Sequence, residues 1–317
     1  MMPYLGIDVG SVSTNIVLLD DSEQLVDREY LRTGGQPISA LKKGLKAIHD
    51  RHQQVEITGV GTTGSGRNLA GIMVGADIIK NEITAHSVAA SRAVPGVKTV
   101  LEIGGQDSKI IILREGIATD FAMNTVCAAG TGSFLDQQAH RLGIPIEEFG
   151  DYALKAKTPV RIAGRCSVFA ESDMIHKQQL GHSLEEIIAG LCEALVRNYL
   201  TNIARGKNIR EPVIFQGGVA ANIGIKTAFE KALGLEVMVP ENHDVMGAIG
   251  AARLAREALN NSGSTTDFKG FSLTEFNYRV ESFECEGCPN HCEIINIYQD
   301  DQLIARWGAR CPRWQAV

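Results

Sequence analysis

The chain has 317 residues, of which 44% are hydrophobic and 21% are charged, so it is an ordinary globular protein of about two domains rather than a disordered one. Its formal net charge of −6 gives no overall attraction for nucleic acid or for an anionic membrane surface. No apolar run reaches the ~18 residues of a membrane-spanning helix, and the N-terminus lacks the pattern of an export signal. We therefore expect a cytoplasmic protein that binds neither nucleic acid nor membrane.

Two similar strand–turn–strand units lie about a hundred residues apart. Strands are predicted over residues 4–9, 14–19, 24–31 and 55–60, and helices over 38–52 and 82–92. Residues 5–17 and 101–112 then share one plan, in which an apolar strand, a polar turn with glycine and a second apolar strand follow each other. These units predict an internal duplication with one phosphate-binding hairpin in each half. Coincidence between two common β-hairpins is the alternative.

The second half of the chain is predicted to be mainly helical. Helices are expected over residues 130–141, 167–178, 183–203 and 244–259, and a short strand over 213–215 precedes a Gly-Gly turn. The last of these helices is rich in alanine and glycine, which permits close packing against a neighbour. We expect a first lobe over residues 1–95, a second lobe over 96–259, and a linker with a small cysteine-rich tail over 260–317.

Three turns carry candidate nucleotide-binding residues, because glycine lets backbone N–H groups approach phosphate oxygens and hydroxyl groups add donors. The first turn offers Gly10, Ser11, Ser13 and Thr14, the second offers Gly104 and Gly105, and the third offers Gly217 and Gly218 for the nucleoside. Gly130 and Gly132 complete this set of candidates. Each turn alone is better explained by a purely structural role. Together, and in this order, they favour nucleotide binding.

Three side chains in the first two turns are candidates for catalysis. Asp8 is suited to holding a water bound to Mg²⁺, since Mg²⁺ prefers carboxylate and water ligands. Gln106 is suited to orienting the attacking water, and Asp107 to contacting the metal through a water. The chain lacks a G-x-x-x-x-G-K-[ST] motif, so it does not belong to the P-loop class of nucleotide-binding proteins.

The order of these turns resembles that of the actin/Hsp70/sugar-kinase superfamily of two-lobed ATPases. In this sequence, as in that superfamily, the features come in one order: a first phosphate hairpin, a second phosphate hairpin, a Gly-Gly turn for the adenosine and a connecting helix of small residues. The resemblance implies an α/β fold of two lobes, with ATP or ADP and Mg²⁺ between them.

Cys127 and Cys166 each directly precede an apparent helix, whose positive end stabilises a thiolate or an anionic iron–sulfur cluster. Two cysteines cannot fill the four thiolate positions of a [4Fe-4S] cluster. Two copies of the chain related by a two-fold axis could supply all four. On spacing alone, a pair of unrelated buried cysteines is the alternative.

Four segments resemble the activator (archerase) ATPases of 2-hydroxyacyl-CoA dehydratases and benzoyl-CoA reductases, a family that also serves double-cubane cluster proteins. They are residues 126–135 (VCAAGTGSFL), 164–173 (GRCSVFAESD), 103–107 (IGGQD) and 216–219 (QGGV). The resemblance runs from about Tyr4 to Leu259. It implies a homodimer with one [4Fe-4S] cluster bridging the protomers, ATP hydrolysis coupled to electron transfer, an iron–sulfur acceptor enzyme, and ferredoxin or flavodoxin as the electron donor.

The tail carries four of the seven cysteines: Cys285, Cys288, Cys292 and Cys311. Four cysteines within a short window predict a metal site, either structural Zn²⁺ or a second [4Fe-4S] cluster, with unmetallated thiols as the third alternative. The seventh, Cys192, lies in an apolar helix and is expected to be a packing residue. Glu82 and His86 lack metal-binding spacing, so we expect a capping role or a hydrogen bond between the lobes.

Two other functions remain open on the sequence. A small-molecule kinase of the same superfamily would need a general-base carboxylate beside the second phosphate hairpin. A metal-stabilised binding module would use the tail cysteines structurally, and nucleotide binding would then only regulate its assembly.

Overall fold

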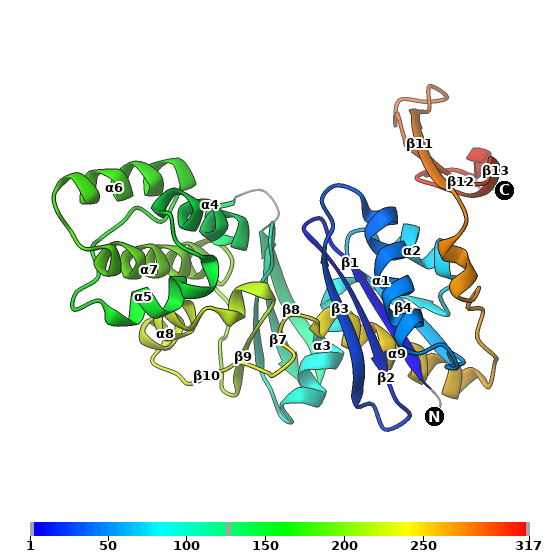
Figure 1. Cartoon of the computed structure of the whole chain (residues 1–317), viewed down its shortest axis with the longest axis horizontal. Coiled ribbons are helices and arrows are strands. Elements are labelled where there is room, and N and C mark those ends of the chain that lie inside the picture. The colour runs from blue at the N-terminus through cyan, green and yellow to red at the C-terminus, as the bar shows by residue number, and fades with distance from the viewer. Residues whose placement is uncertain (1–2, 125–127, 315–317) are drawn as a thin grey trace.

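The computed structural model describes residues 3–124 and 128–314, and it shows two lobes side by side with a small tail attached to one of them (Figure 1). The sheet of the first lobe contains β1 (Tyr4–Val9), β2 (Ser13–Leu19), β3 (Leu25–Arg32), β4 (Gly59–Thr63) and β5 (Ile78–Ile79). The sheet of the second lobe contains β6 (Thr99–Ile103), β7 (Ser108–Arg114), β8 (Ile117–Asn124), β9 (Val213–Gln216) and β10 (Val237–Met238). The two-lobed α/β architecture expected from the sequence is therefore confirmed.

The two sheets have the same topology. Their strand orders are β3-β2-β1-β4-β5 and β8-β7-β6-β9-β10. Strand β1 is antiparallel to β2 and parallel to β4, and β6 is antiparallel to β7 and parallel to β9. This shared order confirms the predicted internal duplication, because two unrelated hairpins would not each continue into the same third, fourth and fifth neighbours.

Helices cover both sheets (Figure 1). Those of the first lobe are α1 (Pro37–Arg51), α2 (Arg67–Val74), α3 (Glu82–Ala93) and α9 (Met246–Ser262). Those of the second lobe are α4 (Gly132–Leu142), α5 (Phe149–Lys155), α6 (Ser167–Gln179), α7 (Leu184–Asn202) and α8 (Ile223–Leu233). In the described part of the chain, no helix combines the length and the apolar character needed to cross a membrane.

Helix α9 packs backbone to backbone against the first sheet. A methyl group added to Gly6 of β1 would stand 1.9 Å from the carbonyl oxygen of Ala248, and one on Gly61 of β4 would stand 2.0 Å from that of Ala251. The glycines of these strands are therefore required by the helix, and Gly250 of α9 is required in turn by α3, because a methyl group on it would stand 1.9 Å from the carbonyl oxygen of Ala85. The contacts of α9 with β1, β4 and α3 place it with the first lobe, whereas the expected boundary grouped it with the second.

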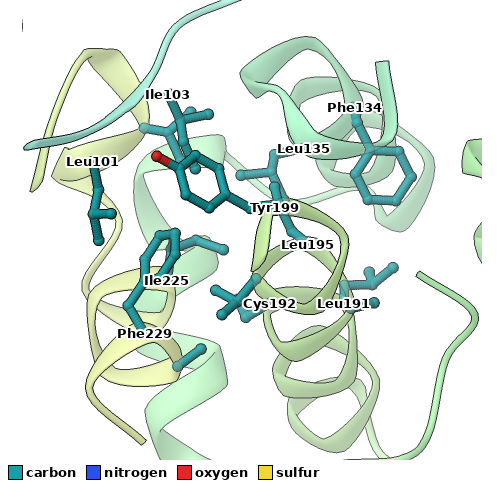
Figure 2. Packing of buried hydrophobic residues seen from close by; sticks show 14 of the residues in the cluster. Leu101, Ile103, Phe134, Leu135, Leu191, Cys192, Leu195, Tyr199, Ile225 and Phe229 are labelled. Carbon is teal, nitrogen blue, oxygen red and sulfur yellow. The ribbon is translucent and has the colours of Figure 1, made fainter. Parts of the chain in front are cut away.

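The core of the second lobe is built around α7. Figure 2 shows four side chains of α7 in this core: Leu191, Cys192, Leu195 and Tyr199. They pack against Phe134 and Leu135 of α4 and against Ile225 and Phe229 of α8. The rings of Tyr199 and Phe229 meet edge to face with their centroids 5.2 Å apart. Cys192 is 1% exposed and burial raises the pKa of its thiol to about 12, so its expected packing role is confirmed.

After α9 the chain returns along the first lobe before it forms the tail. Leu273 is buried in the core of that lobe, Phe271 stacks on His49 with ring centroids 4.6 Å apart, and Lys269 N–H donates to the carbonyl oxygen of Val74. The tail is a three-stranded antiparallel sheet of β11 (Tyr278–Glu284), β12 (Glu293–Gln299) and β13 (Gln302–Trp307). It projects from the first lobe on the side away from the second (Figure 1).

Candidate functional site

A cleft between the lobes consists of two adjoining cavities of about 260 and 430 Å³ that share seven lining residues. Eleven of the residues expected from the sequence line it: Asp8, Gly10, Ser11, Ser13, Gly104, Gly105, Gln106, Asp107, Gly132, Gly217 and Gly218. Turns that lie as much as two hundred residues apart in the chain thus surround one space large enough for a nucleotide.

Two expected binding residues lie behind the cleft instead of lining it. Thr14 is buried, and its hydroxyl group lies 2.9 Å from that of Thr33, which in turn donates to the carbonyl oxygen of Gly10. The carbonyl oxygen of Gly130 accepts a hydrogen bond of 2.8 Å from the hydroxyl group of Ser108. Both residues therefore support the turns that face the cleft.

The two hairpin turns have the same backbone geometry and meet across the cleft. Gly10 N–H donates to the carbonyl oxygen of Ser13 at 2.8 Å, and Gly104 N–H donates to that of Asp107 at 3.0 Å. A methyl group on Gly105 would stand 2.6 Å from Cβ of Val12 in the other hairpin. The two turns approach each other so closely that nothing larger than glycine fits at this contact. One phosphate chain could therefore contact both turns.

Asp8 lies near the end of β1, where it is partly buried, lines the cleft and is closely packed on two sides. A Cβ on Gly247 would stand 2.1 Å from one of its carboxylate oxygens, and a Cβ on Gly64 would stand 2.5 Å from the other. Burial, together with the negative charge of Glu82, raises the pKa of Asp8 to about 7, against the attraction of Lys109. Asp8 therefore holds its proton to a higher pH than a free carboxyl group does.

Lys109 is the residue in the cleft that the sequence analysis missed. Its Nζ lies 2.8 Å from a carboxylate oxygen of Glu82, 3.0 Å from one of Glu102 and 2.8 Å from one of Asp107. Burial opposes its charge, but the three carboxylates raise its pKa, so the ammonium group stays charged. The repeat of the two hairpins could have indicated this residue. Lys109 faces Glu102 in the second hairpin at the position where Asn15 faces Asp8 in the first.

Negative charge exceeds positive charge in this part of the cleft. Among the described lining residues of the smaller cavity there are five carboxyl groups, whereas Lys109 is the one Lys or Arg. Asp244 has a separate partner in Arg28 at 2.6 Å. Burial and the nearby Asp107 raise the pKa of Glu102 to about 8 despite Lys109. Three of the five carboxyl groups surround Lys109. Within the described residues, no three potential ligand side chains lie close enough together to hold a metal ion.

Helix α3 connects the lobes through Glu82 and His86. Glu82 reaches Lys109 on β7, and the strong attraction of that ammonium group lowers the pKa of the carboxyl group even though burial raises it. Nε2 of Gln216, on β9, donates to Nδ1 of His86 at 2.7 Å. Burial and the charge of Lys109 lower the pKa of His86 to about 4, so its ring is neutral. The expected bonding between lobes is confirmed for both residues.

Cys166 is the N-cap residue of α6 and is partly exposed. Val168 and Phe169, in the first turn of that helix, are each 66% exposed. Two further apolar side chains, Phe121 and Met123, are exposed on the edge strand β8. Cys127, the other expected cluster ligand, lies outside the described residues. A cysteine at a helix N-terminus beside exposed apolar side chains is suited to a site at a protein interface.

The second hairpin is bonded directly to the helix that follows it. At the start of α4, Gly132 N–H donates to the carbonyl oxygen of Gly104 at 2.9 Å. The Ser133 hydroxyl group donates to that of Gly105 at 2.6 Å. At the other end of α4, Arg141 forms an ion pair of 2.7 Å with Glu171 of α6. A chain of direct contacts therefore runs from the cleft to the helix capped by Cys166.

The chain was compared with known proteins. The model of the BadF/BadG/BcrA/BcrD ATPase family matches residues 5–255. This chain belongs to that family. The (R)-2-hydroxyglutaryl-CoA dehydratase activating ATPase of Acidaminococcus fermentans is 36% identical over 79% of this chain and 96% of its own length. The activator of lactoyl-CoA dehydratase of Anaerotignum propionicum is 35% identical over 81% of this chain and 98% of its own length.

A solved structure agrees with the assignment to the BadF/BadG/BcrA/BcrD ATPase family. The activator of the 2-hydroxyisocaproyl-CoA dehydratase from Clostridium difficile, with bound ADPNP, superimposes with a TM-score of 0.76 at 29% identity. The match covers 85% of this chain and 100% of that one. The protein is therefore a two-lobed ATPase. The family match ends at residue 255, so the tail lies beyond it.

Proposed function

We propose that the protein is a homodimeric ATPase that uses ATP hydrolysis to deliver an electron to a partner iron–sulfur enzyme. The partner would be a 2-hydroxyacyl-CoA dehydratase, a benzoyl-CoA reductase-like enzyme or a double-cubane cluster protein, and a ferredoxin or flavodoxin would supply the electron. The names of the relatives support a dehydratase or reductase partner. The observation that carries the proposal is the chain of contacts from the Gly104-Gly105 turn through α4 to the helix of Cys166.

The residues of the cleft fit a nucleotide with a divalent cation. Mg²⁺, when bound, would neutralise charge on the phosphate oxygens. Both hairpin turns line the cleft. Their N–H groups other than those of Gly10 and Gly104, which are bonded within the hairpins, would bind those oxygens, while Gly217 and Gly218 would lie against the nucleoside. Asp8 would hold a water next to the cation. Gln106 is exposed at the tip of the second turn, where it would orient the water that attacks the γ-phosphate.

The donor set around Cys166 fits one end of a shared iron–sulfur cluster. Its sulfur belongs to the residue that caps α6, and the helix dipole favours a thiolate there. Cys127 and Cys166 of both protomers would supply four thiolates. A cluster held in this way would store and release one electron. Phe121, Met123, Val168 and Phe169 would be covered by the second protomer or by the partner enzyme.

Nucleotide binding would act on Cys166 through packed contacts. ATP that contacts both hairpins would favour a closed arrangement of the lobes, because each lobe contributes one hairpin. The second hairpin is bonded to Ser133 of α4, and Arg141 of α4 is paired with Glu171 of α6. Motion of the hairpin would therefore turn α4 and α6 together and change the surface around Cys166. Hydrolysis would reset the lobes and make electron delivery one-way.

The proposal is tested by anaerobic purification of the full chain. We expect a dimer with about four iron and four sulfide per two chains, and a cluster signal whose oxidation by an added acceptor depends on ATP. Cys166→Ala and Cys127→Ala should lose the iron. Cys192→Ala, which removes a buried packing cysteine, is the matched control and should keep it. A strictly monomeric or iron-free protein, or one that transfers phosphate from ATP to a sugar, would contradict the proposal.

A further inference from the structure

The tail has very little core of its own. Within the described residues 278–314, four side chains are buried: Cys285, Ile294, Asn296 and Ile297. Every residue of β11 after its first is exposed. Modules of below about 40 residues usually need a disulfide, a metal or a partner to hold their fold. A three-stranded sheet that buries so few apolar side chains therefore calls for a further source of stability.

The cysteines of the tail gather where such a link would act. Cys285 directly follows β11 and Cys292 directly precedes β12, and Cys285 N–H donates to the carbonyl oxygen of Cys292 at 2.8 Å. The two residues thus face each other across the end of the hairpin. Cys288 lies in the short loop between them, where His291 N–H donates to its carbonyl oxygen at 3.3 Å.

The sulfur of Cys285 is surrounded by N–H donors. The indole N–H of Trp314 lies 3.2 Å from it, and the backbone N–H of Gly287 also donates to it. A cysteine sulfur that binds a metal ion commonly also accepts such hydrogen bonds from neighbouring groups. The ring of Trp314 also packs on Phe283 with centroids 5.2 Å apart. These contacts bring the segment that begins with Cys311 back to the end of the hairpin.

We propose that the four cysteines of the tail bind a single Zn²⁺ that holds the hairpin and the last segment together. In the described chain no three potential ligands are yet gathered closely enough to share an ion. Cys288 and Cys311 are exposed, however, so their side chains can turn towards Cys285 without disturbing a core. Binding of the ion would then complete the folding of the tail, as it does in small zinc modules.

The hairpin brings two of the four cysteines close together. Residues that face each other in a hydrogen-bonded antiparallel pair have Cα atoms about 5.5 Å apart, which places two thiolates near one small ion. Three of the four cysteines lie in one tight loop. His291 is engaged elsewhere, since its Nδ1 lies 2.6 Å from a carboxylate oxygen of Glu284 on the exposed side of the hairpin. Four thiolates without histidine suit Zn²⁺ and also suit an iron–sulfur cluster, so the test below measures both metals.

The test measures zinc, iron and cobalt in the full chain. We expect about one zinc per chain, and Co²⁺ exchanged for it should give the visible absorption of a tetrahedral thiolate complex. Cys285→Ser and Cys311→Ser should each lose most of that zinc, while His291→Ala should retain it. Cys166→Ala should lose iron and keep zinc, so the tail site and the proposed function fail or succeed separately.

A second readout follows the fold of the tail. Removal of zinc by a chelator should speed amide hydrogen exchange in residues 278–307 and leave the exchange of α7 unchanged. A tail that carries iron and sulfide, a disulfide between Cys285 and Cys292, or a zinc-free tail with the same exchange rates would overturn the proposal.

Discussion

The two hairpins of the cleft have turns of the same kind, but a different residue faces the acidic side chain in each of them. In the first, Asp8 faces the neutral Asn15, whereas in the second Glu102 faces the charged Lys109. Each turn is also anchored by a hydroxyl group, from Thr33 in the first and from Ser133 in the second. The duplication thus kept the backbone and changed the charges. In the first hairpin Asp8 has no lysine opposite it, and the second hairpin is bonded to Glu82 of α3 through Lys109.

The largest effect is expected from removal of the buried cation. Lys109→Met leaves Glu102 and its neighbouring carboxyl groups without a counter-charge, so the free energy of unfolding should fall by about 3–5 kcal/mol. Denaturant unfolding with ATPase assays measures this. The double variant Lys109→Met with Glu102→Gln should recover only part of the loss, because Glu82 and Asp107 also lose their counter-charge. Asn15→Ala, at the matching position of the first hairpin, should cost much less. Equal losses of stability in the Lys109 and Asn15 variants would show that the charge of Lys109 is not what distinguishes the second hairpin.

A pH-dependent effect is expected from Asp8. Its pKa is about 7 in the folded protein and 3.8 in a free carboxyl group, so the folded state holds the proton more tightly. Between pH 4 and pH 7 the unfolded state loses this proton first. Stability therefore falls as pH rises, by up to about 1.4 kcal/mol per pH unit, and levels off above pH 7.

Asp8→Asn removes the pH-dependent contribution of Asp8 to stability. Its stability relative to the parent protein should grow from pH 4 to pH 7, while ATPase activity drops by about 100-fold or more. Thermal unfolding across this range measures the first effect, and phosphate release measures the second. Asp21→Asn, at an exposed position, is the control. A stability difference that does not change with pH would show that Asp8 titrates normally.

The smallest effect is expected from the hydroxyl anchors. Ser133→Ala removes one side-chain hydrogen bond to the second hairpin and should cost about 1 kcal/mol of stability. Thr33→Val removes the hydroxyl group that bonds Gly10 and Thr14 of the first hairpin and should cost about 1–2 kcal/mol. Of these two side chains, only that of Ser133 connects a hairpin to α4. Its variant should therefore lower the number of electrons delivered per ATP, and Thr33→Val should not. Equal electron yields in the two variants would argue against α4 as the connection.

Much of the fold could be predicted because the two halves repeat an apolar pattern. The strands of the first hairpin, the helix over 82–92 and the long helix α7 lie within a few residues of their expected positions. Strand β8 was missed because it is an edge strand with a mostly exposed pattern, so its polar residues hide the alternation. The strand expected over 55–60 lies over 59–63 instead, where it pairs with β1.

The site was predicted less completely than the fold. Turns that carry glycine and hydroxyl groups are visible in the sequence, and most of their residues line the cleft. Lys109 was not visible in this way, because a lysine in a strand is ordinarily read as facing solvent. Its partners Glu82, Glu102 and Asp107 come from a helix, a strand and a turn. Only the folded arrangement of the lobes brings these charges together.

The attachment of the tail also has a practical consequence. Phe271 and Leu273 fix the base of the tail to the first lobe, while Cys166 belongs to a helix of the second. The distance between spin labels or fluorophores attached to these two parts can therefore be measured. Their separation would report the angle between the lobes at each stage of the nucleotide cycle, without any label in the cleft itself.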